Sequence, residues 1–531
     1  MTVEFKSCSA PEAFDVLVVG GGINGAGIAR DLAGRGLKVM LCERDDLAAH
    51  TSSSSTKLIH GGLRYLEYSK FGLVRKSLQE REALLRSAPH IMGQMRFVLP
   101  HAPDMRPAWM IRAGLFIYDH LARRAWLPGS CAIDLRTHPA GAPLKPNFVR
   151  GFNYSDGWVD DARLVTLCAV DAAERGATVR TRTACTSAVR GADGWHATLL
   201  QASGQGQYII ARALVNATGP WAQRFLQSAV RHADGRAMQT HMSLRLVRGS
   251  HIVVPQLFTH PDAYILQVDA RRVVFAIPYQ GAFTLIGTTE VQVPEPSGAE
   301  ICTDEEVAYL CKAVNRYFRV EVKPEHVVWR YAGVRPLLED HGGDASAVTR
   351  DYRLEVVDGG APLLTVWGGK ITTFRKLSEQ AADRLCCIIG APGSAWTRHA
   401  HLPGGDLSAW IQPGARPDID FAKFLRTVQQ RYAWLPPPLA ERLARAYGSR
   451  IDRVLITESG QPAQQLADLG PPVVLDVYAA EIDYLRREEW ACSADDILWR
   501  RSKIGLHTNE YHRAQLHAWL AQTPLAIRRA V

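Results

Sequence analysis

The stretch KLIHGGLRYLE, residues 57–67, combines a histidine, two adjacent glycines, an arginine and a tyrosine, which together could hold an anion. The twin glycines would let the backbone approach another group closely, so that Arg64 and Tyr65 would be presented to that group. A guanidinium forms a planar fork onto phosphate oxygens, and a phenol adds a neutral donor. We therefore interpret Arg64 and Tyr65 as candidate substrate-binding residues. The alternative is a surface arginine paired with Glu67 and a half-buried tyrosine.

Three further cations lie later in the chain. Arg335 stands between an apolar turn and Pro336, where a guanidinium has little reason to lie unless it meets an anion. Lys370 follows two glycines at the start of a predicted helix, the end at which a cation is electrostatically unfavourable. We predict that both contact an anion such as a substrate phosphate, with a solvated lysine as the alternative for Lys370. Arg350 has the adjacent Asp351 as an easy structural partner, so its role is left open.

The elements that position these residues begin with a glycine-rich turn. Gly20, Gly22 and Gly25 are spaced G-x-G-x-x-G after the apolar strand 14–20 and open a helix, and Glu43 ends the next strand. In such a turn the glycines permit close approach of a pyrophosphate, the helix N-terminus attracts its charge, and the carboxylate binds ribose hydroxyls. We predict dinucleotide binding rather than a merely tight turn. A glutamate at position 43 disfavours NADP, and the motif alone leaves NAD and FAD open.

Two later motifs favour FAD. NATGPW (216–221) ends a buried strand with a glycine turn that would run beside the same cofactor, and WGGKITTF (367–374) is a second glycine pair entering a helix. A second helix N-terminus can stabilise negative charge on a reduced ring, whereas a nicotinamide domain would normally be complete within one half of the chain. The serine run 52–55 would bond the cofactor, unless it is an ordinary solvated turn. The predicted cofactor-binding residues are Gly20, Gly22, Gly25, Glu43, Ser53, Ser54, Thr56, Gly61, Gly62, Ala217, Gly219, Gly368, Gly369 and Thr372.

The remaining chain shows two kinds of strand pattern. Continuously apolar strands at 14–20, 37–43 and 211–219 indicate a parallel sheet that is buried on both faces. Short apolar runs separated by turn residues, from about residue 250 onward, indicate an antiparallel meander. Helices are predicted at 74–88, 161–175, 304–318 and over much of 407–531.

The composition limits the class of protein. At 531 residues the chain is too long for one core, so two or three domains are expected. No apolar stretch of ~20 residues predicts a spanning helix, and the N-terminus lacks the apolar region of a signal peptide. Ten cysteines without a C-x-x-C pair suggest reduced thiols in the cytosol. The net charge of +9 favours anionic partners, but the basic residues are spread too evenly for a nucleic-acid binder.

Several specific stretches follow one another along the chain, among them VVGGGINGAGIARDLAGRGL, TSSSSTKLIHGGLRYLE, FNYSDGWVDDARL and VWGGKITTFRKL. In these stretches the sequence resembles the FAD-dependent glycerol-3-phosphate dehydrogenases, in particular the aerobic respiratory bacterial type, over nearly its full length. The resemblance implies oxidation of sn-glycerol 3-phosphate to dihydroxyacetone phosphate, with hydride passing from C2 to flavin N5 and electrons passing on to membrane quinone. It also implies a dissociable FAD, although covalent attachment stays open. No calcium-loop run D-x-[DN]-x-[DN]-G is present, and we predict no metal site.

By the same resemblance, the fold class is α/β plus α+β. A Rossmann-like, discontinuous FAD-binding domain would comprise residues 11–70, 145–235 and 345–390. An antiparallel-sheet domain that binds substrate and faces the membrane would comprise 71–144 and 236–344. A helical C-terminal cap would comprise 391–531.

The resemblance also implies catalytic roles. The C2 hydroxyl of the substrate must lose a proton, and an imidazole titrating near neutrality suits that task. His251, in RGSHIVVP, is the family-matched base, and Arg335 and Lys370 complete the predicted catalytic set. His60, beside the twin glycines, and water are the alternatives, because most histidines in proteins have structural roles. The predicted substrate-binding set is Arg64, Tyr65, Arg335, Arg350 and Lys370.

A basic, apolar segment at 106–126 bears on the cellular location. It mixes residues such as Trp109 and Phe116 with four arginines, which suits an amphipathic segment in a membrane interface or, alternatively, a core helix with snorkelling arginines. From the resemblance we expect a cytoplasmic enzyme attached peripherally to the anionic inner face of the cell membrane, with a homodimer left open. Two other functions remain open: an oxidase that passes electrons to dioxygen, and a non-catalytic flavin-bound sensor.

Overall fold

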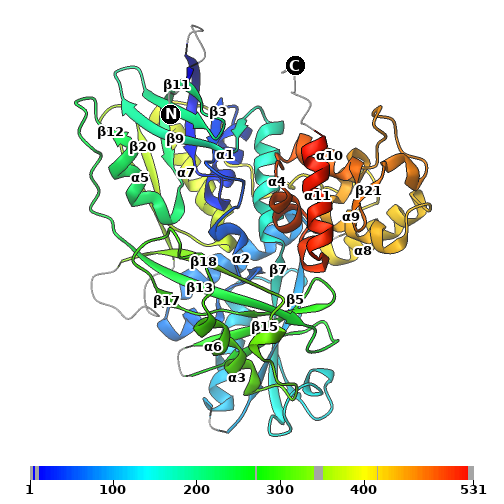
Figure 1. The fold of residues 1–531 in the computed structure, drawn as a ribbon. Helices are drawn as coiled ribbons and strands as arrows, with labels where there is room; N and C mark the ends of the chain where they lie inside the picture. The colour runs from blue at the N-terminus through cyan, green and yellow to red at the C-terminus, as the bar shows by residue number, and fades with distance from the viewer. Residues whose placement is uncertain are drawn as a thin grey trace.

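The computed structural model describes residues 4–5, 11–103, 105–269, 272–339, 351–414 and 416–523. Within these residues, two ten-stranded sheets lie one above the other in the view of Figure 1, and a largely helical C-terminal region lies beside them. The predicted fold class is confirmed: a Rossmann-like domain, an antiparallel-sheet domain and a helical C-terminal domain.

The first sheet contains the strands on either side of the glycine-rich turn. It consists of β1 (Glu4–Phe5), β2 (Glu12–Val19), β3 (Val39–Cys42), β8 (Thr178–Arg180), β9 (Thr183–Arg190), β10 (Trp195–Gln201), β11 (Gln205–Asn216), β12 (Val230–Arg231), β19 (Tyr352–Val357) and β20 (Leu363–Gly368). Strands β11, β2, β3 and β8 run parallel, as the continuously apolar sequences predicted. Strand β20 also pairs in parallel with β11, so distant segments end at the same edge of the sheet.

Helices cover both faces of this sheet. They are α1 (Ile23–Gly34), α4 (Asp161–Glu174) and α7 (Phe374–Ile389) on one face and α5 (Ala222–Ala229) on the other. Along β2, Val16 and Val18 belong to the core formed with α1, whereas Leu17 and Val19 belong to the core formed with α5. All four side chains are buried, which explains why this strand is apolar at every position rather than at alternate ones.

The second sheet contains the predicted meander. It consists of β4 (Leu58–Ile59), β5 (Met92–His101), β6 (Cys131–Asp134), β7 (Arg150–Val159), β13 (Leu244–Pro255), β14 (Ala263–Gln267), β15 (Val273–Tyr279), β16 (Phe283–Gly287), β17 (Val291–Gln292) and β18 (Trp329–Leu338). Strands β14, β15, β16 and β13 are antiparallel neighbours in that order, so the meander is confirmed. Helices α2 (Phe71–Ser87), α3 (Ala108–His120) and α6 (Asp304–Asn315) accompany this sheet.

The pairing of β4 and β7 differs from the predicted grouping of segments. Residues 58–59 and 150–159 were assigned to the cofactor-binding segments, but both strands pair in the second sheet. The physical reason is a ten-pair antiparallel ladder between β5 and β7, from Met92 opposite Val159 to His101 opposite Arg150. Chain segments therefore pass between the two sheets within the predicted domain bounds, and those bounds stay a prediction.

The C-terminal region has a core of its own, formed by residues such as Phe424, Leu443 and Ile482. Its elements are α8 (Pro417–Arg431), α9 (Pro437–Tyr447), α10 (Ala479–Glu488), a π-helical turn (Asp496–Arg501), α11 (Glu510–Gln522) and the hairpin of β21 (Pro472–Val474) and β22 (Val477–Tyr478). The region lies against α4 of the first domain (Figure 1).

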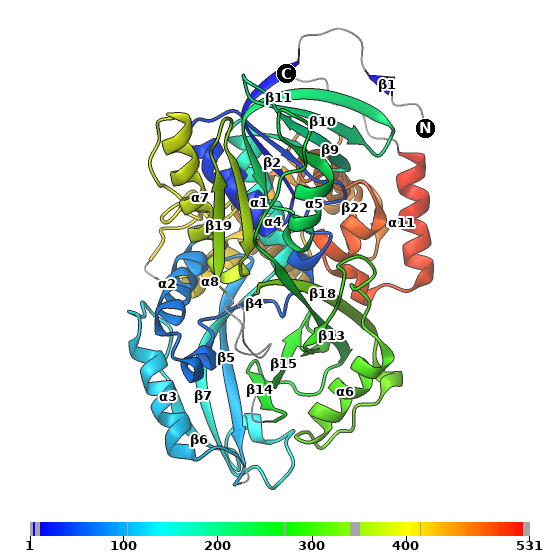
Figure 2. The same cartoon turned by 90° about the vertical axis from the view of Figure 1, so that its left-hand side faces the viewer.

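Helix α3 lies at the lower end of the molecule in both views (Figures 1 and 2). Leu115 and Tyr118 on one side of it are buried, whereas Trp109 and Phe116 are 70% and 55% exposed. The predicted amphipathic helix is therefore present, with large apolar side chains directed to solvent. Among the described residues, none of the helices combines the length and the apolar content needed to span a bilayer.

Candidate active site

The turn between β2 and α1 leaves a helix end open at the edge of the first sheet. Gly20 has a φ of +111°, and a Cβ atom on it would lie 2.6 Å from the carbonyl oxygen of Ala217. Gly22 is the N-cap residue and has no side chain to bond the first N–H groups of the helix. The N–H of Ile23 donates to Ser52 Oγ at 3.0 Å. Ser52 thus satisfies one N–H of the first turn of α1, and this turn lines the cavity described below, where the helix N-terminus can attract phosphate oxygens.

Glu43 lies directly after β3 and faces this turn. Its Oε2 accepts from the N–H of Gly21 at 2.6 Å, and its Oε1 accepts from the N–H of Asp45 at 2.9 Å. Burial raises the pKa of Glu43 in spite of these two donors. The carboxylate is therefore oriented by backbone groups on two sides, as a group that accepts hydrogen bonds from ribose hydroxyls must be.

A cavity of about 680 Å³ runs along the turn and continues between the two sheets. It brings together residues from the first turn, the serine run, the twin-glycine loop, the end of β11 and the end of β20. The predicted cofactor-binding residues that line it are Gly20, Gly22, Glu43, Ser54, Thr56, Gly62, Ala217, Gly219, Gly368, Gly369 and Thr372.

Three predicted cofactor-binding residues do not line the cavity. Gly25 supports the turn from within α1, because a Cβ there would lie 1.8 Å from the carbonyl oxygen of Gly20. Ser53 turns its Oγ back to the carbonyl of His50, at 3.2 Å. Gly61 directs its N–H into the protein, toward Tyr118. Their contact with a cofactor stays a prediction, and in the structure these three residues support the loops that line the cavity.

The predicted cations converge on the same cavity. Arg64, Tyr65, Arg335 and Lys370 all line it. The Nζ atom of Lys370 lies 3.8 Å from the centre of the Tyr65 ring, and Arg335 Nη2 donates to Thr288 Oγ1 at 2.9 Å. The side chains come from the 3₁₀ segment Leu63–Tyr68, from β18 and from the residue before Ile371–Thr373. Positive charge from three separate parts of the chain is thus gathered at one place, where it can bind a phosphate.

The sequence analysis gave Glu67 and Asp351 as alternative partners of Arg64 and Arg350. Glu67, the proposed surface partner of Arg64, instead pairs with Arg106, whose Nη2 donates to Glu67 Oε2 at 3.0 Å. Arg350 lies outside the described residues. Asp351, its proposed partner, accepts a hydrogen bond from Lys76 Nζ at 3.5 Å.

The predicted base His251 lies beside the cavity without lining it. Its side chain is buried on β13, stacks on Tyr331 with ring centres 4.9 Å apart, and has Nε2 2.9 Å from Thr56 Oγ1. Thr56 lines the cavity and separates His251 from it. Burial, together with the positive charges of Arg335 and Lys57, lowers the pKa of His251 well below its usual value. His251 is therefore a neutral imidazole that reaches the cavity through a hydroxyl.

The alternative base His60 lines the cavity itself. Its backbone N–H donates to Thr372 Oγ1 at 3.3 Å, which ties the twin-glycine loop to the turn before α7. The next N–H, that of Gly61, donates to Tyr118 Oη at 2.9 Å and to Asp156 Oδ1 at 3.2 Å. Asp156 also accepts from Arg81 Nη1 at 2.7 Å. A buried carboxylate thus supports the loop that presents Arg64 and Tyr65.

Two cavity residues were missed by the sequence analysis. Thr288 follows β16 and bonds Arg335, but the threonine pair Thr288–Thr289 after a strand has no distinguishing pattern. Asn24 lies in the first turn of α1 and donates from Nδ2 to the carbonyl of Gly368 at 3.3 Å. Its Oδ1 atom is buried and receives no hydrogen bond from the described residues. The position of Asn24 inside the glycine motif was a signal that could have identified it.

Two family models match successive parts of the chain. A family model described as FAD dependent oxidoreductase matches residues 15–375, and one described as the C-terminal domain of alpha-glycerophosphate oxidase matches residues 395–521. A glycerol-3-phosphate dehydrogenase of Pseudomonas aeruginosa is 49% identical over 96% of both chains. The chain belongs to the family of FAD-dependent glycerol-3-phosphate dehydrogenases.

One similar protein is named for a different substrate. A D-erythritol 1-phosphate dehydrogenase of Brucella abortus is 48% identical to this dehydrogenase, over 96% of this chain and 98% of the other. The crystal structure of a glycerol-3-phosphate dehydrogenase from Bacillus halodurans complexed with FAD has a TM-score of 0.73 at 24% identity, and covers 96% of this chain and 90% of that one. This last likeness shows that the fold is shared.

The cofactor of the family is FAD, and the cavity of this dehydrogenase fits it. The N-terminus of α1 offers N–H donors to a pyrophosphate, and the Glu43 carboxylate offers an acceptor to a ribose. Because Gly20 has no side chain, the backbone of the turn can pass close to Ala217 and leave room for the cofactor. The glycine pair Gly368–Gly369, from much later in the sequence, lines the same cavity.

The depressed pKa of His251 predicts a pH dependence of stability. Below about pH 6.5 the unfolded chain binds a proton at His251 and the folded protein does not, so the free energy of unfolding decreases as the pH falls. This group contributes up to ~1.4 kcal/mol per pH unit. Between about pH 7.5 and 5.5, the free energy of unfolding measured in urea should fall by ~1.4 kcal/mol less in total for His251→Gln than for the wild type. Substitution of the exposed His399 is the control, and an unchanged slope in His251→Gln would contradict the assignment.

Proposed function

We propose that this dehydrogenase oxidises the C2 hydroxyl of sn-glycerol 3-phosphate and releases dihydroxyacetone phosphate. The observation that carries the proposal is the convergence of Arg64, Arg335 and Lys370 on the cavity that also contains the glycine turn of the cofactor site. FAD, when bound, accepts the two electrons and the hydrogen that leave C2 as hydride. The protein has to bind the phosphate, orient C2 and accept the hydroxyl proton.

Phosphate binding is assigned to the three cations and to Tyr65. Arg64 is presented by a loop whose backbone is held at Gly61 by Asp156 and Tyr118. Arg335 is oriented by its bond to Thr288, and Lys370 by its position over the Tyr65 ring. Because these groups are held in place before substrate arrives, binding a doubly charged phosphate costs little reorganisation.

Proton removal is assigned to His251 acting through Thr56. The Nε2 atom of His251 is 2.9 Å from Thr56 Oγ1, so the hydroxyl can pass a proton from the cavity to the imidazole. A neutral imidazole is the form that can accept a proton. His60, which lines the cavity directly, is the second candidate for the base.

One observation supports a second candidate substrate, D-erythritol 1-phosphate. The relative named for D-erythritol 1-phosphate is 48% identical, against 49% for the relative named for glycerol 3-phosphate, so identity alone does not separate a three-carbon from a four-carbon polyol phosphate. Both would present a phosphate to the same cations. We place glycerol 3-phosphate first because the family model of the C-terminal domain also takes its description from a glycerophosphate enzyme.

The electron acceptor is proposed to be a membrane quinone, with dioxygen as the alternative. The exposed apolar side of α3, with Arg123 beside its end, suits contact with an anionic membrane surface, where a quinone is available. Such attachment would be peripheral, on the cytoplasmic side. Formation of peroxide, measured against reduction of a soluble quinone, distinguishes the two acceptors.

The substrate prediction is tested by anaerobic mixing of the purified holoenzyme with glycerol 3-phosphate, D-erythritol 1-phosphate or glycerol. We expect glycerol 3-phosphate to bleach the flavin absorbance fastest, and unphosphorylated glycerol to leave it nearly unchanged. Faster bleaching by D-erythritol 1-phosphate would replace the substrate in the proposal. No bleaching by either phosphate would contradict it.

In the same assay, Arg64→Ala should raise the KM for glycerol 3-phosphate by roughly 10- to 100-fold, since a hydrogen bond to a charged group contributes ~1.5–3 kcal/mol. Arg75→Ala, an exposed arginine on α2, is the matched control and should leave the KM unchanged. If KM and kcat of Arg64→Ala both equal those of the wild type, Arg64 does not bind the phosphate.

The two histidines are separated by comparing His251→Gln with His60→Gln. Loss of the base should lower kcat by ~10²–10⁴-fold. We expect this loss in His251→Gln and less than about tenfold in His60→Gln, while FAD content stays the same in both. The reverse pattern would move the role to His60, and a small effect in both would assign it to water.

Membrane attachment is tested with vesicles that contain anionic lipid. The double substitution Trp109→Ser and Phe116→Ser should lower the bound fraction at least about tenfold, because each side chain contributes ~1.5–3 kcal/mol when it is buried. Ile301→Ser, which changes an apolar residue that is 64% exposed on a different part of the surface, is the control. Release of the wild-type protein by salt alone would indicate electrostatic attachment without insertion.

A further inference from the structure

The segment between β3 and β4, residues 44–57, is called the cofactor loop here because it forms one wall of the FAD cavity. It includes the serine run, and its Ser52 bonds the first turn of α1. Its Thr51 Oγ1 also donates to the carbonyl of Val334 on β18, at 2.7 Å. Apart from the two-residue β4 that follows it, the loop has no strand partner along its length. Backbone hydrogen bonds anchor the loop at Asp45, Ala48 and Lys57, and side-chain contacts hold the residues beside these points.

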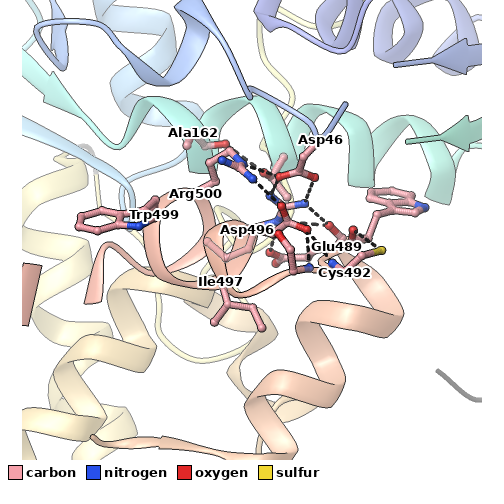
Figure 3. Close-up of polar contacts among 12 residues, drawn as sticks. Asp46, Ala162, Glu489, Cys492, Asp496, Ile497, Trp499 and Arg500 are labelled. Atoms are coloured by element: carbon pink, nitrogen blue, oxygen red, sulfur yellow. Dashed lines mark hydrogen bonds and ion pairs between the residues drawn. The ribbon is translucent and has the colours of Figure 1, made fainter. Parts of the chain in front are cut away.

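The beginning of the cofactor loop is held by two arginines of the C-terminal domain. Asp46 is buried, and Arg501 approaches its carboxylate with both terminal nitrogens, Nη1 to Oδ2 at 2.6 Å and Nη2 to Oδ1 at 2.8 Å. Arg500 Nε adds a third contact to Oδ2 at 2.6 Å. Figure 3 shows Asp46 facing Arg500 and the turn that contains it. A two-pronged pair of this kind fixes orientation as well as distance.

Arg501 is held rigidly from its other side. Its Nη2 and Nε donate to the carbonyl oxygen of Glu489, at 2.6 and 3.2 Å, and its side chain is fully buried. Arg500 also pairs with Asp496 in the same π-helical turn. Asp496, which is buried, accepts in addition from the N–H of the exposed Cys492 at 2.7 Å (Figure 3). The two arginines are therefore fixed by the C-terminal domain before they meet Asp46.

The end of the cofactor loop is held by a second buried cluster. Lys57 Nζ lies 2.8 Å from Asp161 Oδ2, at the start of α4, and also donates to the carbonyl of Ser53 at 2.8 Å. Ser55 Oγ donates to the same Asp161 oxygen at 2.7 Å. Lys503, again from the C-terminal domain, lies 3.8 Å from Asp161 Oδ1 and is buried. One end of the loop thus meets Arg500 and Arg501 directly, and the other end meets Asp161, which Lys503 also approaches.

We infer that the C-terminal domain is a working part of the FAD site, in which Arg501 and Arg500 act as positioning residues that hold the cofactor loop through Asp46, with Lys503 assisting at Asp161. The loop carries Ser52, Ser54 and Thr56 to the cavity, so loosening its ends disorders that wall. The consequence is weaker retention of FAD. The alternative is that these residues only attach one domain to the other. In that case, any buried contact between the two domains would affect FAD retention equally.

A matched control separates these two roles. Arg163, on α4, pairs with Glu489 of the C-terminal domain, and both side chains are as buried as Arg501 and Asp46. Among the described residues, its hydrogen bonds go to Glu489 and to the carbonyl of Ala446, so it does not bond the cofactor loop. Because Glu489 also contacts Arg501, Arg163→Gln disturbs the other side of Arg501 as well as the domain contact, and the contact of Arg501 with Asp46 is what differs between the two variants.

The experiment compares Arg501→Gln, Arg501→Lys and Arg163→Gln in the full chain. The rate of FAD release from diluted holoenzyme is followed by the fluorescence of free flavin, the Kd for FAD is measured on deflavinated protein, and thermal unfolding gives stability. We expect Arg501→Gln to raise the Kd at least about tenfold through faster release, and Arg501→Lys to recover part of the affinity, because it keeps the charge. Arg163→Gln should lower thermal stability as much as Arg501→Gln does, but should change the Kd for FAD less than about twofold.

Asp46→Asn completes a double-mutant cycle. If Arg501 acts through Asp46, adding Arg501→Gln to Asp46→Asn should change the Kd for FAD less than about threefold further. Independent, multiplicative effects would overturn the inference, as would equal changes in the Kd from Arg501→Gln and Arg163→Gln, or no change from either. If Arg501→Gln does not fold, Arg500→Gln, at the partly accessible neighbour, is measured with the same expectations.

Discussion

Close approach of the backbone at Gly20 is the constraint on which the site depends. With a Cβ at this position 2.6 Å from the carbonyl of Ala217, strands β2 and β11 can end side by side only without a side chain between them. Because β20 pairs with the other edge of β11, the glycine pair at 368–369 arrives at the same place. Lys370, which follows this glycine pair, reaches the cavity beside the end of α1 in this way.

The local patterns were sufficient to predict the parts of the structure that local chemistry determines. The glycine spacing predicted the turn, the run of apolar residues predicted a strand buried on both faces, and the short apolar runs predicted the meander. Arg335 and Lys370 were predicted because each stands where a charge is otherwise unfavourable, and Arg64 because the twin glycines would present it to another group. The family resemblance supplied the chemistry that joins them, which their spacing alone did not.

Other features depend on contacts that have no local signal. His251 looked like a base open to substrate, but packing on Tyr331 and the hydroxyl of Thr56 places it behind the cavity wall. Gly61 was predicted to contact a cofactor, yet its N–H is turned to a carboxylate on β7 that the sequence does not mark. Asp46 and Arg501 are 455 residues apart, and neither stands out among its neighbours in the sequence.

Pairing of β20 with β11 has a consequence for biosynthesis. Strand β20 begins at Leu363, 147 residues after β11 ends at Asn216, which at ~5–20 residues per second corresponds to roughly 7–30 s of translation. During that interval the nascent amino-terminal strands have an unpaired edge at β11 and lack one end of the flavin cleft. Such an edge is prone to wrong association, so the growing polypeptide has to be shielded near the ribosome until the later segment emerges.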